Sequence, residues 1–230
     1  MGRDDVFRVR SSSIPAVGES NSEQAIINRF GSQVVTDFYT QLLLSGFCFH
    51  IQSGNEDAPV TTNGPMDDAD AGIVADNTSG SMMPLLFEYN ISALGGATLA
   101  MAMLEADMDK VRYTSGGTVY VPEQMNKAAT SANAAAGTFY TIEGSDIVTA
   151  GKSAVPASVE LARIVQTENA LADTIGYPGA WNNEVFNVRS RTPVILTNPG
   201  SLCAHFGATT ADPTGWAVLQ FAQFPTALAY

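Results

Sequence analysis

Residues 192–225 read TPVILTNPGSLCAHFGATTADPTGWAVLQFAQFP, and this stretch decides the fold class. Two groups of turn-forming residues, Asn198-Pro199-Gly200 and Asp212-Pro213-Thr214-Gly215, divide it into three apolar runs. Proline presets φ at the second position of a turn, and glycine accepts the positive φ that a type II turn requires at the third position. The stretch therefore predicts three strands, with a type II turn between the first two.

Most of the remaining chain also predicts β-strands. Apolar Phe47, Phe49 and Ile51 alternate with the residues between them, which is the period of two that a strand shows. Further strands are expected at residues 85–91, 98–105, 111–113, 118–121, 139–142, 147–148 and 159–165, although 159–172 fits a helix as well. Many short strands with Gly and Pro turns, no βαβ rhythm and no repeat of about 20–50 residues predict a mainly β sandwich or barrel.

The N-terminal part predicts an arm followed by a helical segment. Residues 1–22 are expected to form a semi-ordered arm, and residues 23–230 a single β domain. Ser20 and Glu23 fit a capping box, and apolar residues then recur at near-helical spacing as far as Leu42. Residues 53–84 hold few large apolar side chains and many Gly, Asn, Asp, Thr and Pro residues, which predicts a long surface excursion.

The charge balance is strongly acidic. There are 23 acids against 11 bases, the net charge is −12, and only three of the bases are Lys. Between Arg29 and Lys110 the sequence has eleven acids and no base. Binding to phosphate backbones requires a basic surface, so this balance argues against a nucleic-acid binder. An acidic surface repels itself at low salt and is screened within about 3 Å at about 1 M salt. We expect a protein of a high-salt environment, or else an ordinary acidic protein.

No residue pattern predicts catalysis or cofactor binding. Nucleotide-binding glycine motifs are absent from the sequence. Residues 18–22 (GESNS) lack the second Gly of a nucleophile elbow. The acidic groups at 67–70 and 107–109 match no EF-hand loop, and a solvated acidic surface explains them better than a calcium site. We therefore expect a protein that is not an enzyme, with no catalytic residue, no cofactor and no metal ligand. The longest strongly apolar stretch, at 99–104, is far shorter than the ~20 residues that span a bilayer, so we expect solubility.

Two Cys and two His form a repeated Cys-x-His pattern, at Cys48 and His50 and again at Cys203 and His205. Residues i and i+2 of a strand share a face, so two neighbouring strands would bring the four side chains to a tetrahedral zinc site. Against this, cysteine often packs in cores as a small apolar residue. Cys48 and Cys203 are instead the candidates for a disulfide within the chain or for a link between subunits, and the further alternative is two unlinked thiols.

The order of elements in the opening stretch resembles the closing strands of viral jelly-roll capsid proteins. The residues concerned are Thr192–Phe206, with their Asn-Pro-Gly turn, and the Trp-led strand in Gly215–Pro225. With its acidic composition and a length of 230 residues, the chain looks like the larger major capsid protein of haloarchaeal icosahedral viruses with an internal membrane. This sphaerolipovirus-like family uses vertical single β-barrels. The resemblance implies a single jelly-roll barrel or sandwich, with a long β-rich insertion at 53–84, at 113–155 or at both.

The resemblance also implies a function. Members of that family are structural virion proteins, so the chain is expected to be a capsid subunit of an archaeal virus that assembles into an icosahedral shell. The expected partners are further copies of the chain, a second and smaller capsid protein, and the lipids of the internal membrane, which Arg3, Arg8 and Arg10 would face. Direct sequence-specific contact with nucleic acid is not expected. Two alternatives stay open: a cupin-like metal enzyme, and a carbohydrate-binding or adhesion module that uses Trp181 beside Tyr177.

Overall fold

The computed structural model describes residues 38–62, 66, 69–93, 99–127, 133–167, 184–208 and 212–226. Within this part the chain is mainly β, as predicted, with one short helix, α1 (Phe38–Leu44). The predicted arm and the start of the predicted helical segment lie outside the described residues, as do Tyr177 and Trp181. No helix of the described part is long and apolar enough to cross a membrane.

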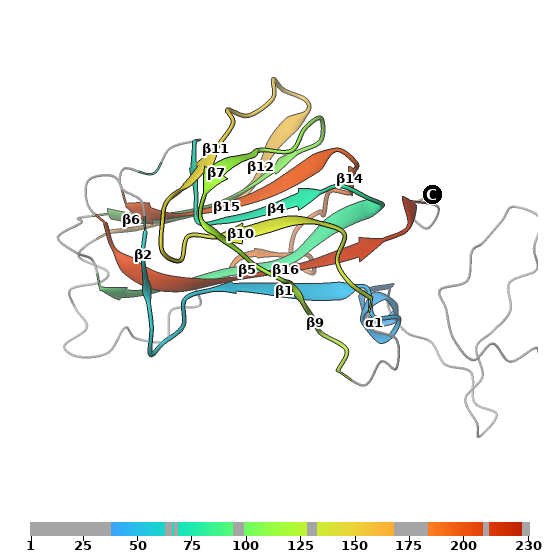
Figure 1. The fold of residues 1–230 in the computed structure, drawn as a ribbon, viewed down its shortest axis with the longest axis horizontal. Helices are drawn as coiled ribbons and strands as arrows, with labels where there is room; N and C mark the ends of the chain where they lie inside the picture. Colours follow the sequence, from blue (N-terminus) through green and yellow to red (C-terminus); the bar gives the residue numbers. More distant parts are fainter. Residues whose placement is uncertain are drawn as a thin grey trace, which may run out of the picture.

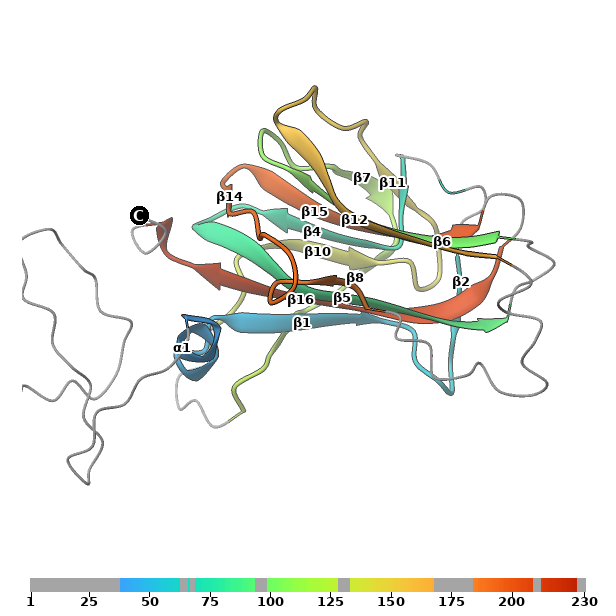
Figure 2. The same ribbon diagram turned by 180° about the vertical axis from the view of Figure 1, so that it is seen from behind.

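Two large antiparallel sheets stack on each other, with the second sheet above the first in Figure 1 and the same two layers seen from behind in Figure 2. Strands in the order β13-β5-β16-β1 form the centre of the first sheet, and strands in the order β12-β6-β15-β4 form the centre of the second. Their bounds are β1 (Cys48–Ser53), β4 (Ile73–Asn77), β5 (Ser81–Ala93), β6 (Leu99–Asp107), β12 (Ser158–Thr167), β13 (Glu184–Asn187), β15 (Gly200–Ala208) and β16 (Thr214–Phe224).

Short strands extend both sheets and build a third. In the first sheet, β9 lies beside β1, β14 pairs with β5 and β2 pairs with β16; in the second, β10 and β8 continue beyond β4. The third sheet has the order β3-β11-β7. The bounds are β2 (Val60–Thr61), β3 (Asp70–Ala71), β7 (Tyr113–Gly116), β8 (Thr118–Val119), β9 (Glu123–Gln124), β10 (Gly137–Thr141), β11 (Ile147–Thr149) and β14 (Leu196–Thr197).

The eight central strands pair in a nested order. The first pairs with the last (β1 with β16), the second with the seventh (β4 with β15), the third with the sixth (β5 with β13) and the fourth with the fifth (β6 with β12). The chain therefore traces one long antiparallel hairpin. Two further ladders, β16 with β5 and β15 with β6, wind this hairpin into the two sheets. Among the described strands no ladder closes either sheet into a barrel, so the arrangement is a sandwich.

The hydrophobic core fills the space between the two sheets. Alternate residues of each strand face inward, and on β15 these are Leu202, Ala204 and Phe206. Phe221 of β16 stacks on Phe49 of β1, with 5.7 Å between ring centroids, and on Phe139 of β10 in the opposite sheet, with 5.5 Å. This aromatic stack joins the two layers because its rings come from both sheets.

Residues 108–157, which connect β6 to β12, are rich in short strands. β7 and β11 of this segment lie in the third sheet, and Ile147 of β11 packs against Val74 and Cys203 on the outward face of the second sheet. Residues 118–127 then run from the edge of the second sheet, at β8, to the edge of the first sheet, at β9. Between them Tyr120 packs against the core. The segment thus covers one face and one edge of the sandwich, on the near side of Figure 1.

The predicted surface excursion at residues 53–84 is wrong for its second half. Residues 73–77 form β4, in which every residue is buried, and residues 81–84 begin β5. Asp76 and Asn77 give this segment a loop-like composition, but both are buried with hydrogen-bond partners. Asp76 accepts from the backbone N–H of Arg112, and Asn77 donates to the carbonyl of Leu196.

Two of the three strands predicted near the C-terminal end are confirmed, as β15 and β16. The first, predicted at 192–197, is reduced to the two residues of β14. The predicted type II turn is wrong, because Gly200 is the first residue of β15 and is not among the glycines with positive φ. The Asn198–Pro199 peptide bond is cis.

Candidate functional site

The outward face of the second sheet carries charged side chains that are shielded from solvent. On β6 the residues Ala102, Leu104 and Ala106 face the core, so the strand alternation turns Glu105 and Asp107 to the other side. Residues 108–157 fold back over this side. Five of these charged residues are at most 2% exposed, and we call them the charged cluster: Asp76, Glu105, Asp107, Arg112 and His205.

Glu105 lies at the centre of the charged cluster. Arg112 Nη1 donates to Glu105 Oε2 at 2.8 Å, and Lys152 Nζ lies 3.4 Å from Oε1. Arg112 Nε also donates to the carbonyl of Ala150, at 3.0 Å. Burial by itself raises the pKa of Glu105, but hydrogen bonds from His205 and Arg112 outweigh it and lower the pKa to about 2. The carboxylate is therefore ionised at neutral pH.

The surroundings of His205 favour its protonated form. Its Nδ1 lies 2.6 Å from the carbonyl oxygen of Asp70, which can only accept, so Nδ1 carries a hydrogen. Its Nε2 faces Glu105 Oε2 at 3.4 Å, and a second hydrogen there gives an imidazolium beside a carboxylate. Burial alone lowers the pKa of His205, but interactions with Cys203 and Glu105 outweigh it and raise the pKa to about 9.

The two aspartates of the charged cluster hold backbone groups of residues 108–157. Asp76 accepts from the N–H groups of Arg112 and Tyr113, both at 3.1 Å. Asp107 accepts from the N–H of Ser153 at 2.8 Å and from its hydroxyl at 2.9 Å. Burial raises the pKa of Asp76, whereas for Asp107 the hydrogen bonds outweigh burial and lower the pKa. The start and the end of the segment are thereby fixed to the second sheet.

The side chains of the charged cluster bind other groups of the protein, and their arrangement suits them to hold a segment in place. Each carboxylate accepts hydrogen bonds from protein groups. The surface hollow between residues 54–61 and 142–146 and the groove beside α1 are lined by other residues. Among the described residues no group of three or more His, Cys, Asp and Glu is placed to hold a metal ion. The cluster therefore binds the segment 108–157 to the sandwich.

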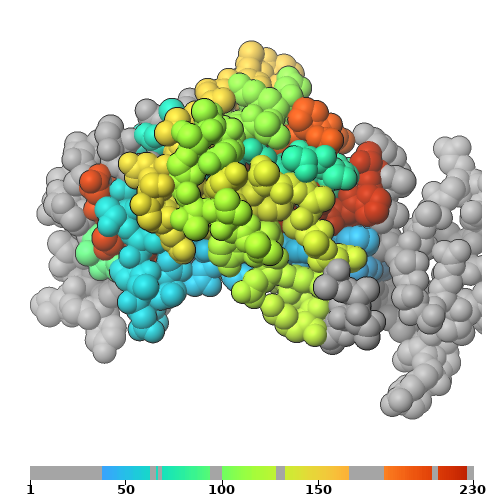
Figure 3. Space-filling view, in the orientation of Figure 1, coloured from blue at the N-terminus to red at the C-terminus, as the bar shows by residue number. Residues whose placement is uncertain are grey.

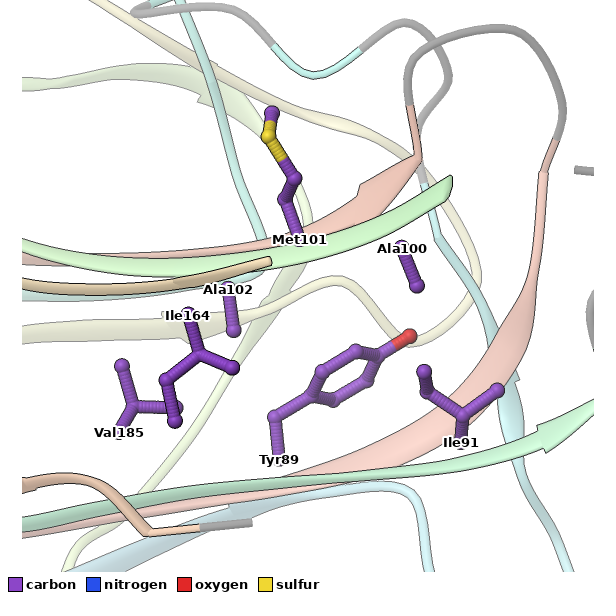
Figure 4. A pocket seen from close by; sticks show the side chains of 7 residues that line it. All are labelled: Tyr89, Ile91, Ala100, Met101, Ala102, Ile164 and Val185. Atoms are coloured by element: carbon purple, nitrogen blue, oxygen red, sulfur yellow. The ribbon is translucent and has the colours of Figure 1, made fainter. Parts of the chain in front are cut away.

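A small cavity lies between the two sheets. Tyr89, Ile91, Ala100, Ala102 and Ile164 are among its lining residues (Figure 4), and its volume is about 10 Å³. Burial raises the pKa of Tyr89, whose hydroxyl is buried without a hydrogen-bond partner among the described protein groups. A space of this size holds about one water molecule. This cavity therefore has no room for a ligand larger than a water molecule.

The structure separates the two Cys-x-His pairs. Within each pair the side chains share a face, as predicted, but β1 and β15 belong to different sheets. Cys48 packs under α1 on the outward face of the first sheet, and Cys203 lies on the outward face of the second, beside the charged cluster. The four side chains consequently do not meet, and the zinc alternative has no site in this fold.

The interpretation of Cys48 and Cys203 as a disulfide within the chain is wrong, because both thiols are free. Stacked sheets lie about 10 Å apart, and a disulfide needs two Cα atoms within about 7 Å. Burial raises the pKa of the Cys48 thiol to about 12. A link between subunits through either cysteine stays a prediction, and it requires local opening because both side chains are buried.

Sequence reasoning missed the charged cluster. Glu105 and Asp107 sit two residues apart in an apolar run, and this spacing is a signal that one face of the strand is polar. The partners Arg112 and His205 come from other elements, which the spacing cannot reveal. Comparison with protein-family models, with curated proteins and with solved structures finds no match for this chain.

Proposed function

We propose that this chain is a jelly-roll capsid subunit, a structural protein of a virion. The observation that carries the proposal is the nested pairing of the eight central strands, wound into two sheets. A double sheet of eight antiparallel strands is the jelly-roll arrangement, which viral capsid proteins, lectin domains and cupins share. The likeness of the strand pairing to a jelly roll supports these three candidate classes, and the side chains are used to choose among them.

The filled interior favours a structural role over a cupin-like enzyme. Enzymes and binding proteins hold small ligands in pockets of about 300–1,000 Å³. In this sandwich the aromatic stack of Phe49, Phe139 and Phe221 occupies the space between the sheets, and the cavity beside Tyr89 measures about 10 Å³. A filled core of this kind supports a structural protein that is rigid inside and contacts other subunits through its outer surfaces.

The outer surface supports the same role. The charged cluster fixes both ends of the segment 108–157 to the sandwich through hydrogen bonds from Arg112 and Ser153, so these ends are a firm part of the exterior. Exposed valines on the segment, such as Val121 and Val155, leave apolar surface for contacts with other molecules. The net charge of −12 is suited to multimolar salt, where repulsion between copies is screened.

The proposed partners follow from this role. Further copies of the chain, together with a second and smaller capsid protein, would form an icosahedral shell above an internal membrane of a virus in a salt-rich host environment. The chain would then be found in the virion. Proteins of this kind act through their contacts, so the proposal assigns no catalytic residue and no cofactor.

Sedimentation velocity of the full chain, from low salt to multimolar NaCl, tests the proposal. We expect discrete oligomers whose share grows with salt, and electron microscopy of the fastest fraction should show rings or shells. A chain that stays monomeric at every salt concentration would contradict an assembling subunit. Stoichiometric binding of a soluble sugar or of a metal by the monomer would instead favour the lectin or cupin class.

A further inference from the structure

One edge of the sandwich combines exposed valines with acids. Here residues 118–127 cross from the edge of the second sheet to the edge of the first. Val119 and Val121 point outward on either side of Tyr120, which packs against the core. Residues 142–148 adjoin them, because the Thr118 hydroxyl donates to the carbonyl of Glu143. We call residues 118–127 and 142–148 the acidic edge. Figure 3 shows this side, with the green and yellow atoms of the segment 108–157 across it.

The charges of the acidic edge are mostly negative. Three acids, Glu123, Glu143 and Asp146, oppose one base, Lys127. Lys127 pairs with Glu123 at 2.8 Å, which leaves the other two carboxylates to set the charge of the surface. Val148 adds a third exposed valine to the edge, since Ile147 beside it turns toward the second sheet.

The opposite edge of the sandwich combines exposed aliphatic residues with arginines. It consists of β12, β13 and residues 188–195, and β12 lies on the near side in Figure 2. Arg191 Nη1 lies 3.4 Å from the carbonyl of Leu161, which holds residues 188–195 beside β12. The exposed aliphatic side chains are Val159, Val165 and Ile195. We call β12, β13 and residues 188–195 the basic edge.

The basic edge stands out against the acidic chain. The basic edge contains three arginines and two glutamates, so its bases outnumber its acids. The arginines are Arg163, Arg189 and Arg191, and the glutamates are Glu160 and Glu184. Arg163 pairs with Glu160 at 2.6 Å on the exposed surface. In a chain with a net charge of −12, a described surface with an excess of bases is the natural partner of an acidic one.

We infer that copies of this chain associate head to tail, with the basic edge of one copy against the acidic edge of the next. The inference rests on the proposed function, because it names the surfaces through which the subunit would assemble. Both edges offer three exposed aliphatic side chains, and their charges are complementary. Two acidic edges would repel each other instead. Because the two edges lie on opposite sides of the sandwich, the contact is heterologous and builds rings or rows of subunits.

Two substitutions in the full chain test this contact. Val121→Arg places a base on the acidic edge, and Val165→Asp places an acid on the basic edge, so each charge opposes the proposed complementarity. The two side chains are 82% and 49% exposed, so both variants should fold. Val155→Asp is the matched control, since Val155 is 85% exposed and its loop, residues 150–157, lies at the tip of the molecule in both ribbon views. Circular dichroism checks that each variant keeps its fold.

The inference predicts different outcomes for the variants alone and mixed. Each edge variant alone should sediment as a monomer under conditions where the wild type and Val155→Asp form oligomers. An equimolar mixture should associate again, because the intact basic edge of the Val121→Arg variant can bind the intact acidic edge of the Val165→Asp variant.

Oligomers of either edge variant alone that match the wild type would overturn the inference while leaving the capsid proposal intact. The same holds for a mixture that stays monomeric. A wild type that is monomeric at every salt concentration would overturn both.

Discussion

Glu105 and His205 are buried beside each other, and their shifted pKa values favour a carboxylate next to an imidazolium. Removing such groups from water costs several kcal/mol per ion, and their attraction offsets this only when the geometry is good and the remaining hydrogen-bonding capacity is used. Here Arg112 and Lys152 supply further positive charge to the same carboxylate. A charged network of this kind specifies one position of the segment 108–157 on the sheet, because a shifted position would leave a buried charge without its partner.

The pKa shifts of the same pair predict how stability depends on pH. The folded state raises the pKa of His205 from 6.5 to about 9, so this contribution is fully present below pH 6.5 and is lost as the pH rises through 9. The folded state lowers the pKa of Glu105 from 4.5 to about 2, so its contribution is present above pH 4.5 and is lost on acidification. The contributions of Glu105 and His205 are both fully present between pH 4.5 and pH 6.5. For these two groups, the midpoint of thermal unfolding should therefore be highest in this range.

His205→Gln should remove the alkaline half of this dependence. Between pH 6 and 9 the wild type should lose up to about 3 kcal/mol of unfolding free energy from this group, whereas the variant should lose much less. His50→Gln is the control, since His50 lies on the outward face of the first sheet, away from the charged cluster. A wild-type midpoint that does not fall between pH 6 and 9 would show that His205 is not an imidazolium in the folded state.

At the scale of the strands, the aromatic stack gives the next prediction. Phe221→Ala should lower the unfolding free energy by about 3–5 kcal/mol, because the ring is fully buried between Phe49 and Phe139 and its loss leaves a cavity. Val218→Ala, on the outward side of the same strand, should cost about 1 kcal/mol or less. Denaturant unfolding measures both, and equal losses for the two variants would be inconsistent with a core between the sheets.

The sequence allowed strands with clear boundaries to be predicted. β15 and β16 alternate apolar and smaller residues between Gly and Pro turns, so their positions were predictable. β4 was not, because Asp76 and Asn77 have loop-like side chains, and only the partners that the fold brings to them explain their burial.

The charged cluster could not be predicted from the sequence, for a similar reason. Glu105 and His205 lie on paired strands, but the sequence contains no information about which strands pair. The nested order itself became visible only in the fold.

At the scale of the whole molecule, charge repulsion should couple stability to salt. The net charge of −12 opposes compaction, and the Debye length falls from about 30 Å at 0.01 M salt to about 3 Å at 1 M. We expect the thermal unfolding midpoint to rise with NaCl toward the molar range. A double variant, Glu56→Gln with Asp57→Asn, removes two exposed acids and should show a smaller rise. A midpoint that is independent of salt would contradict a surface adapted to high salt.

The position of β16 between β1 and β5 has a consequence for how the protein is made. On the ribosome, β1 emerges long before residue 214, and it has no sheet partner of its own length until β16 leaves the exit tunnel. The first sheet therefore cannot be completed until residues 214–224 have left the exit tunnel, and pairing across so many residues is intrinsically slow. A nascent or truncated chain that ends before residue 214 would expose the apolar faces of β1 and β5, so such fragments should depend on chaperones or aggregate.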